Sequence, residues 1–378
     1  MNRYPAISDL RKKGINRIPK VAREYLEQGT DNDETLDLNR SDFSKIRFSP
    51  RFLKGELNVV TETELFGRTY ASPFGVAPVG LMSLMWPGIE VKLAKMAKER
   101  NIPFCLSTVA TETPEVVGPH VGQNGWFQLY TPREKALAFK ILDRAKASGF
   151  HTLVITIDIP QPSRRQRTKR AGMAMPLKLT PDLIWQGVKN PAWSLGTLKR
   201  GLPSLKTIEA YSDFNDMMSV GSFVAHQVGG NLSWEYVKAL KDYWDGPVLL
   251  KGIMHKGDAL KAVEYGFDGI VVSNHGGRQF DAALSSIAVL PEIVAAVKGQ
   301  TKIIFDSGVR SGLDIIRAIA LGADFVLLGR AFVYGVCALG DNGAYHAFQI
   351  LQEELINNMK QLGLTQLSEL RELERVII

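Results

Sequence analysis

The chain has 378 residues, of which 45% are hydrophobic and 22% are charged, and its formal net charge is +7. This composition is typical of a folded protein with a large core, and it excludes a chain that is disordered throughout. Its two cysteines, Cys105 and Cys337, form no CxxC pair, so the sequence predicts neither a disulfide framework nor a thiolate metal site. It shows no apolar signal segment and no run of 18 or more apolar residues, so we expect a cytoplasmic protein without membrane spans.

Eight short, continuously apolar runs begin at about residue 74, and segments with helical spacing separate them. The runs are 74–78, 103–106, 126–130, 152–157, 247–250, 269–272, 302–305 and 324–328. Strands buried on both faces have this pattern, and eight successive strand–helix units imply a closed parallel barrel. An open doubly wound sheet is the alternative, but no GxGxxG follows the first strand. We therefore predict an α/β fold: one (β/α)8 TIM barrel domain over residues 1–378, with an N-terminal helical extension over about 1–70.

A long insertion, about residues 163–231, separates the fourth and fifth predicted strands. Its part 163–206 holds ten basic residues and one acidic residue, and tryptophan and leucine side chains interleave with the basic ones. Segments that lie on anionic membrane surfaces have this composition, so we predict peripheral contact with the inner face of the cell membrane through 163–206. An ordinary lid or an oligomer contact is an equally good interpretation of the same residues.

Polar residues follow nearly every predicted strand at its carboxyl end, which is where eightfold barrels carry their active sites. After the sixth strand, residues 273–278 (SNHGGR) place a proton acceptor, His275, three residues before a fixed cation, Arg278. This pair is suited to removing a proton from a substrate that carries an acid group. The sequence therefore predicts an enzyme.

The seventh and eighth strands end in glycine followed closely by arginine, at 308–310 (GVR) and 329–330 (GR). Glycine lets backbone N–H groups approach a phosphate, and arginine supplies a bidentate cation, so we predict a cofactor with a phosphate tail. Lys251 follows the fifth apolar strand, where a cation is costly unless its partner carries or develops negative charge, as a reduced flavin does. A Schiff-base lysine, as in barrel aldolases, is the alternative.

The motifs SNHGGRQ (273–279), DSGVRSG (306–312) and LLGRAF (327–332) together resemble those of the FMN-dependent L-2-hydroxy acid dehydrogenase and oxidase family. This family includes lactate dehydrogenases, mandelate dehydrogenases and glycolate oxidases, and the resemblance extends from Tyr25 to about Leu362. It implies that His275 takes the α-proton of the substrate while FMN is reduced, by hydride transfer or after carbanion formation. It also implies that Asp158 stabilises the protonated histidine and that Tyr130 lies near the substrate hydroxyl.

The same resemblance assigns the binding residues. The residues that match the family's contacts to the substrate carboxylate are Tyr25, Arg165 and Arg278. The positions that match its FMN contacts are Ala77, Pro78, Val79, Ser107, Gln128, Thr156, Lys251 and Ser273, with Asp306, Gly308, Arg310, Gly329 and Arg330 at the phosphate and ribityl group.

Two positions bear on the substrate and on the electron acceptor. Val109 stands where plant-type glycolate oxidases carry tryptophan, which permits a larger substrate, and Gly80 stands where oxidase-type members carry alanine. We therefore predict an L-lactate dehydrogenase that passes electrons to a quinone or another carrier. The alternatives are an (S)-mandelate-type dehydrogenase, which the segments 84–87 (LMWP) and 191–195 (PAWSL) resemble more, and an oxidase that uses O₂. The resemblance also implies a homotetramer.

Two other classes of function remain as distant alternatives: an FMN- or phosphate-binding barrel isomerase or aldolase, and a non-enzymatic binder of membranes or nucleic acid. Neither would need His275, Asp158 and Lys251 together at strand ends. We therefore expect no nucleic-acid partner. The remaining histidines lack the spacing of metal ligands, so we expect no metal site.

Overall fold

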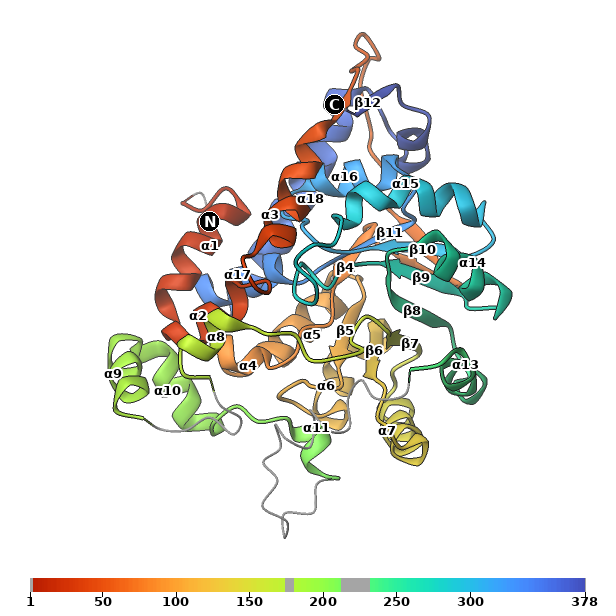
Figure 1. Cartoon of the computed structure of the whole chain (residues 1–378). Helices are drawn as coiled ribbons and strands as arrows, with labels where there is room; N and C mark the ends of the chain where they lie inside the picture. The colour runs from red at the N-terminus through yellow and green to blue at the C-terminus, as the bar shows by residue number, and fades with distance from the viewer. Residues whose placement is uncertain (1–2, 174–179, 212–231, 378) are drawn as a thin grey trace.

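The computed structural model describes residues 3–173, 180–211 and 232–377. At its centre, eight parallel strands pair in chain order, and the last pairs with the first to close a barrel (Figure 1). The strands are β4 (Phe74–Val76), β5 (Phe104–Ser107), β6 (Gly125–Tyr130), β7 (Thr152–Thr156), β8 (Val248–Ile253), β9 (Gly269–Val272), β10 (Lys302–Phe305) and β11 (Phe325–Leu328). The predicted (β/α)8 barrel is confirmed, and each predicted strand overlaps one of these.

Strand β8 differs from its predicted bounds in a way that matters for the site. It continues to Ile253, so Lys251 lies within the strand instead of after its end, and it pairs with residues of both neighbouring strands. The pairing register shifts around Gly252, whose φ is +109°. A Cβ at this position would lie 2.5 Å from the Cβ of Asp158, so glycine both permits the irregular backbone and lets Asp158 come close.

Large side chains fill the barrel interior, which is a packed core rather than a channel. The interior residues are Ala77, Cys105, Trp126, Val154, Leu249, Val271, Ile304, Phe325 and Leu327. A hairpin of β2 (Thr63–Leu65) and β3 (Arg68–Tyr70) packs against them, and Trp126 Nε1 donates a hydrogen bond of 3.2 Å to the Tyr70 hydroxyl. Both turn residues, Phe66 and Gly67, have the positive φ that two-residue type I′ turns require. The hairpin covers the amino-terminal end of the barrel, and the carboxyl end is where a ligand can enter.

Helices surround the barrel, as Figure 1 shows. They are α4 (Met82–Met85), α5 (Ile89–Glu99), α6 (Pro114–Val121), α7 (Lys135–Ala147), α13 (Trp234–Tyr243), α14 (Lys256–Glu264), α15 (Ser286–Val297), α16 (Gly312–Ala320), α17 (Arg330–Leu339) and α18 (Asp341–Leu362). Most follow the predicted spacing, because their apolar positions recur at helical period and are buried against the strands.

The N-terminal segment is helical, as predicted, with α1 (Ile7–Gly14), α2 (Lys20–Glu27) and α3 (Glu34–Ser41). It then forms a short strand, β1 (Ile46–Phe48), which pairs antiparallel with β12 (Arg375–Ile377) near the C-terminus. Helix α1 packs against α17, and the C-terminal end of α2 reaches the carboxyl ends of the barrel strands.

The predicted insertion lies between β7 and β8, and its residues 174–179 and 212–231 lie outside the described residues. It contains α8 (Gln166–Arg170), α9 (Pro181–Lys189), α10 (Pro191–Arg200) and α11 (Lys206–Glu209). Helices α9 and α10 form a pair at one edge of the molecule (Figure 1). Its inner side is anchored, since Trp193 is buried and its Nε1 donates to the carbonyl oxygen of Leu84 over 2.9 Å. Within the described ranges, no helix has the length and apolar character needed to cross a membrane.

Candidate active site

A cavity of about 420 Å³ opens at the carboxyl ends of the barrel strands. This volume is in the range of cofactor and small-molecule sites. Of the residues predicted for substrate or cofactor, those that line the cavity are Tyr25, Ala77, Pro78, Val79, Tyr130, Arg165, Lys251, His275, Arg278, Asp306, Gly308, Arg310, Gly329 and Arg330. They come from α2, from several strand ends and from the start of the insertion, so the fold brings together residues that are far apart in the chain.

His275 and Asp158 form a hydrogen-bonded pair at the edge of this cavity. The Nδ1 of His275 lies 3.0 Å from Oδ1 and 3.1 Å from Oδ2 of Asp158. Because a carboxylate only accepts, we assign the ring proton to Nδ1, which leaves Nε2 free to accept. The Tyr130 hydroxyl lies 3.1 Å from this Nε2 and donates to it. Nε2 is therefore the atom of the pair that can receive a proton.

The backbone around His275 is tightly constrained. His275, Gly276 and Gly277 all have positive φ, at 60°, 68° and 73°. His275 N–H donates to Ser273 Oγ over 3.1 Å, and Gly276 N–H donates to Ser307 Oγ over 2.9 Å. A non-glycine residue in this conformation carries strain, and such residues concentrate at functional sites. The turn thus fixes the imidazole direction relative to the cavity.

The electrostatics of the pair favour a neutral base beside a charged carboxylate. Burial lowers the pKa of His275 below its ordinary value, and the positive charges of Lys251 and Arg165 lower it further, although Asp158 opposes them. Burial raises the pKa of Asp158, but the charges of His275 and Lys251 outweigh it, so that this pKa lies below its usual value. Near neutral pH, His275 can accept a proton and Asp158 is ionised.

Lys251 is a buried cation that faces the cavity, with 4% of its surface exposed. Its Nζ lies 3.4 Å from Asp306 Oδ2 and donates to Ser273 Oγ over 3.0 Å. Burial lowers its pKa, but the charges of Asp306 and Asp158 outweigh it, so that the pKa is raised. The amine stays protonated, which argues against the Schiff-base alternative, because that chemistry needs a free amine.

Three arginines of the cavity wall bond to carbonyl oxygens rather than to carboxylates. Arg330 bonds to the carbonyls of Leu26 (2.8 Å), Gln28 (2.8 Å) and Gly276 (3.1 Å), and Arg278 bonds to those of Tyr25 (2.9 Å) and Gln28 (3.1 Å). The Nη1 of Arg310 bonds to the carbonyl of Val309, and its buried Nε has no partner within the described part of the chain.

These arginines repel one another. Burial and the charge of Arg165 lower the pKa of Arg278 to about 9, and burial and the charge of Arg310 lower the pKa of Arg330 to about 10. A cluster of this kind is suited to bind an anion, because an anion would offset the repulsion and the desolvation.

Glycine at position 308 is required by packing as well as by ligand approach. Gly308 has φ +87°, and a Cβ there would lie 1.9 Å from the carbonyl oxygen of Asn39. At Gly329, a Cβ would come within 3.2 Å of Val79 Cγ2. The expected approach of backbone to phosphate is therefore only one of the reasons for glycine at 308.

Four predicted cofactor residues lie behind the cavity wall instead of lining it: Ser107, Gln128, Thr156 and Ser273. Ser107 Oγ donates to Gln128 Oε1 over 2.7 Å, and Gln128 Nε2 donates to Thr156 Oγ1 over 2.8 Å, which makes a buried chain across three strands. Ser273 bonds to Lys251 and His275. Asp158 likewise does not line the cavity and contacts His275, which does.

The sequence interpretation missed Gln279 and Ser307. Gln279 lines the cavity, and both polar atoms of its buried amide lack a partner among the residues that the structure describes. A buried amide without partners is costly, which indicates that a ligand completes it. Ser307 also lines the cavity, with φ +88°. Both residues lie inside the quoted motifs, directly after Arg278 and Asp306, and this adjacency was the available signal.

These features fit FMN. The unpaired arginines suit its phosphate, the protonated Lys251 suits a ring that gains negative charge on reduction, and the Gln279 amide offers a free donor and acceptor. The base atom, Nε2 of His275, lies at the same cavity.

Comparisons with known proteins agree with this fit. The profile of the family described as FMN-dependent dehydrogenase matches residues 15–375. An L-lactate dehydrogenase of Pseudomonas aeruginosa (strain LESB58) is 39% identical over 367 residues, covering 97% of this chain and 96% of the relative. An L-lactate dehydrogenase of Vibrio parahaemolyticus serotype O3:K6 (strain RIMD 2210633) is 37% identical and covers 97% of each chain.

Solved structures give the same result. The monotopic membrane protein (S)-mandelate dehydrogenase superposes with a TM-score of 0.90 at 31% identity, covering 98% of both chains. A mandelate oxidase superposes with a TM-score of 0.85 at 32% identity, covering 99% of both. The profile match over nearly the whole chain, the full-length relatives and the fit of the cavity to FMN lead to one conclusion: the chain belongs to the FMN-dependent dehydrogenase family, and FMN is its cofactor.

Proposed function

We propose that this protein oxidises an L-2-hydroxy acid to the corresponding 2-oxo acid. The observation that carries the proposal is the pairing of a neutral base with a carboxylate-binding arginine at one cavity: Nε2 of His275 carries no proton and accepts from the Tyr130 hydroxyl, and Arg278 lacks an acidic partner among the described residues. A substrate that carries a carboxylate next to a C–H and O–H group would use both.

The proposed roles follow from the geometry. Oxidation breaks the α C–H bond and the O–H bond of the substrate and forms a C=O bond, which releases two electrons and two protons. FMN, when bound, accepts the two electrons and one of the two protons. His275 Nε2 takes one proton, and Asp158, 3.0 Å from Nδ1, stabilises the imidazolium that results. The Tyr130 hydroxyl, 3.1 Å from Nε2, would lie near the substrate hydroxyl.

The remaining assigned residues have binding roles in this proposal. Arg278, Arg165 and Tyr25 hold the substrate carboxylate, and the Arg278 guanidinium lies 5.0 Å from the centre of the Tyr25 ring. Arg310 and Arg330 hold the FMN phosphate, with the backbone of 77–79 and Lys251 at the ring.

Since α2 and the insertion both contribute to one cavity, we also propose that residues 1–378 act as a single domain.

L-lactate is the substrate we propose first, since the relatives named L-lactate dehydrogenase match over the full chain. An (S)-mandelate-type substrate is the second candidate. Its support is the apolar part of the cavity wall, to which Met85, Val109 and Ile159 contribute, and the two mandelate enzymes among the solved structures. A Cβ at Gly80 would lie 2.6 Å from Val109 Cγ2, so glycine keeps room at this wall.

Flavin bleaching tests both the activity and the substrate. The purified holoprotein is mixed anaerobically with L-lactate, (S)-mandelate, glycolate and longer-chain 2-hydroxy acids, and loss of oxidised-flavin absorbance is followed by stopped flow. We expect fast bleaching with L-lactate and slow or no bleaching with D-lactate, the matched control. A flavin that no L-2-hydroxy acid reduces would exclude the proposed function.

For the electron acceptor we propose a membrane quinone, reached by peripheral contact of residues 163–206 with an anionic lipid surface. The outer side of α9 and α10 exposes Ile184, Trp185, Val188, Leu195 and Leu198, and Lys189 and Lys199 are exposed beside them. Exposed apolar groups with flanking cations suit an interfacial helix pair, and each basic residue near the surface adds about 1 kcal/mol. The solved (S)-mandelate dehydrogenase is itself described as a monotopic membrane protein.

The acceptor and the assembly have direct tests. Reduced protein is mixed with a short-chain quinone or with O₂, and we expect reoxidation by the quinone to be much faster. Faster reoxidation by O₂ would instead support an oxidase.

We also propose a homotetramer, as the family resemblance implies. Sedimentation velocity of the holoprotein tests this, and a smaller assembly would contradict it.

A further inference from the structure

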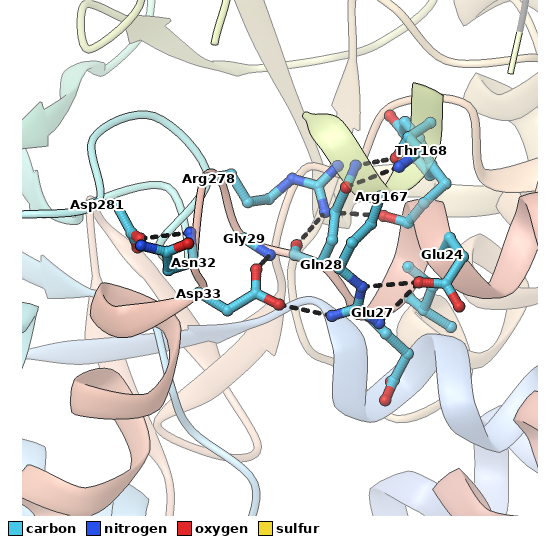
Figure 2. A network of polar contacts seen from close by, with 12 residues as sticks. Glu24, Glu27, Gln28, Gly29, Asn32, Asp33, Arg167, Thr168, Arg278 and Asp281 are labelled. Atoms are coloured by element: carbon cyan, nitrogen blue, oxygen red, sulfur yellow. Dashed lines mark hydrogen bonds and ion pairs between the residues drawn. The ribbon is translucent and has the colours of Figure 1, made fainter. Parts of the chain in front are cut away.

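The C-terminal end of helix α2, together with residues 28–33, receives polar contacts from three segments that border the cavity (Figure 2). Two of these segments contribute cavity arginines. Arg278 Nη1 donates to the carbonyl oxygens of Tyr25 (2.9 Å) and Gln28 (3.1 Å), and Arg330 Nη2 donates to that of Gln28 (2.8 Å). The last carbonyls of a helix have no partner within it and carry partial negative charge, so this end is a suitable anchor for arginines.

The third segment is α8, at the start of the insertion. Arg167 Nε donates to Glu24 Oε2 over 2.8 Å, and its Nη1 donates to Asp33 Oδ2 over 2.6 Å. The next residue, Thr168, donates its N–H to Gln28 Oε1 over 3.0 Å, and Gln28 Nε2 donates back to the Thr168 hydroxyl. Figure 2 shows the Arg167 guanidinium between the two carboxylates, one on α2 and one in the loop after it.

The same loop is locked to the turn that carries His275 and Arg278. Asp33 Oδ1 accepts from Gly29 N–H over 2.7 Å, and a Cβ on Gly29 would lie 2.5 Å from the carbonyl oxygen of Gly277. On the other side, Asn32 N–H donates to Asp281 Oδ2 over 2.8 Å. The loop is therefore a fixed reference, and whatever Arg167 holds against it keeps a defined position relative to the turn.

Arg165 needs such an anchor. Arg165 lines the cavity together with Arg278, and burial and the charge of Arg165 both lower the pKa of Arg278, so the two cations repel. Among the described residues, its hydrogen bonds go to Ser163 and Lys169, which belong to its own segment. Contacts of this kind do not tie Arg165 to the barrel. Its neighbours on both sides make single hydrogen bonds to the 28–33 loop: the Arg164 carbonyl accepts from the Thr30 hydroxyl over 3.4 Å, and Gln166 Nε2 donates to Asp31 Oδ1 over 3.3 Å. The ion pairs of the segment with this loop and with α2 are made by Arg167, two residues further on, and Thr168 adds its paired bonds to Gln28.

We propose that Arg167 is a positioning residue: clamped by Glu24 and Asp33, it holds segment 163–170 against α2 and so keeps Arg165 beside Arg278, where the substrate carboxylate binds. This inference rests on the proposed function, which assigns the carboxylate to these two arginines. Arg167 has 37% of its side chain exposed, and ion pairs at such exposure contribute little to stability. Its contribution is geometric instead, because it opposes the repulsion between Arg165 and Arg278 before the substrate arrives.

Titration of the oxidised holoprotein with oxalate, followed by flavin absorbance, tests the inference without turnover. In Arg167→Met we expect the oxalate Kd to rise about tenfold, a loss the size of one well-placed charged hydrogen bond. The KM for the hydroxy acid should rise similarly, while kcat changes less, because the His275–Asp158 pair keeps its contacts. In Arg165→Met the Kd should rise at least as much.

The double variant Arg165→Met/Arg167→Met separates positioning from an independent contribution. If Arg167 acts through Arg165, the double variant has the Kd of Arg165→Met alone. If the two increases multiply, the proposal is overturned. Arg167→Lys keeps the charge but has no planar fork to join both carboxylates, so we expect an intermediate Kd, and this variant stands in if Arg167→Met does not fold.

Removing the partner carboxylates distinguishes positioning of Arg165 from a purely electrostatic effect of the charges, because the two explanations predict opposite changes in oxalate affinity. In Glu24→Gln/Asp33→Asn, Arg167 stays but loses its clamp, so positioning predicts weaker oxalate binding. A field effect predicts tighter binding, since two negative charges near an anion site are gone. Tighter binding would overturn the proposal.

Arg371→Met is the matched control. This arginine also pairs with a carboxylate, Asp324, at 2.8 Å, but it lies at the opposite end of the barrel strands. We therefore expect the variant to have the oxalate Kd and the KM of the wild type. Because oxalate binding needs no hydroxy acid, the titration tests the positioning of Arg165 separately from the proposed reaction. A protein that binds oxalate as described but is reduced by no hydroxy acid would refute only the proposed function.

Discussion

His275 owes its proposed role to three neighbours that act on different parts of it. Ser273 fixes its backbone N–H, Asp158 fixes the proton on Nδ1, and Tyr130 marks the open side of Nε2. A base held in this way accepts a proton without reorienting, which keeps the cost of reaching the transition state low.

Replacement of this base should remove the reaction and leave the cofactor. In His275→Gln we expect FMN to be retained, because the phosphate arginines are untouched, and we expect flavin reduction to slow by about 10² to 10⁴. Anaerobic stopped flow with substrate measures this rate. His255→Gln, at an exposed histidine that caps the N-terminus of α14, is the control. A His275→Gln variant reduced at the wild-type rate would disprove the role of His275 as base.

The pH dependence of kcat/KM should report the His275–Asp158 pair. Only neutral His275 can accept a proton, and its pKa is lowered, so activity should fall on an acid limb below the ordinary histidine range. Asp158 raises the pKa of His275, so in Asp158→Asn the acid limb should move to lower pH. The plateau should also drop, by about 10² or more, because the imidazolium loses its counter-charge. Profiles of kcat/KM against pH for both proteins provide the check, and a limb that moves to higher pH would contradict it.

At the scale of elements, the insertion has a buried face and an exposed face, and the two have different roles. Buried Leu183, Trp193, Leu205 and Ile208 pack it onto the barrel, while Ile184, Trp185 and their neighbours on α9 and α10 stay exposed. Arg200 and Lys206 also pair with Glu112, in the loop after β5, at 3.7 Å and 3.0 Å. The insertion is therefore part of the site wall as well as a candidate lipid contact.

The lipid contact can be tested without disturbing the wall. In Trp185→Gln/Leu195→Gln/Leu198→Gln we expect loss of co-sedimentation with anionic vesicles at low salt, because these exposed side chains supply the apolar part of the contact. Reduction of a soluble dye should stay unchanged. Phe52→Gln/Leu53→Gln, at equally exposed apolar residues outside the insertion, is the matched control. Wild-type protein that stays in the supernatant would argue against the membrane proposal.

At the scale of the whole molecule, the cavity gathers positive charge that the described residues do not neutralise. Arg278, Arg310 and Arg330 come from different strand ends and line the same cavity, and Arg278 and Arg330 also bond to the end of α2. The fold must hold these charges together, and a bound phosphate offsets their repulsion.

Removal of FMN should therefore destabilise the protein. We expect the apoprotein to melt at a lower temperature than the holoprotein, since a ligand present at about 1,000 times its Kd adds about 4 kcal/mol to the free energy of unfolding. Differential scanning fluorimetry measures the shift. Riboflavin, which lacks the phosphate, should raise the melting temperature of the apoprotein less than FMN does. Inorganic phosphate should recover part of the difference in melting temperature between apoprotein and holoprotein. Equal rescue by riboflavin and FMN would contradict a phosphate role for the arginine cluster.

Much of the fold was predictable from the chain because the signals are local. A strand buried on both faces must be apolar throughout, so the eight runs mark the eight barrel strands. The position of Lys251 was not predictable at this level, because β8 continues through an irregularity that depends on pairing with β9 and on space beside Asp158. The α9–α10 pair shows the same limit, since composition reveals apolar and basic residues but not which of them face the barrel.

The sequence by itself determined the barrel, the family and many of the residues that line the cavity, since chain order and strand-end motifs fix which groups reach the carboxyl end of each strand. Only the tertiary structure decided how these groups are held. It placed the ring proton of His275 toward Asp158, put Ser107, Gln128 and Thr156 behind the wall, left the Gln279 amide open, and set Arg167 between Glu24 and Asp33. The physical reason is that hydrogen bonds and ion pairs depend on distances between segments far apart in the chain, and these distances exist only once the barrel has closed.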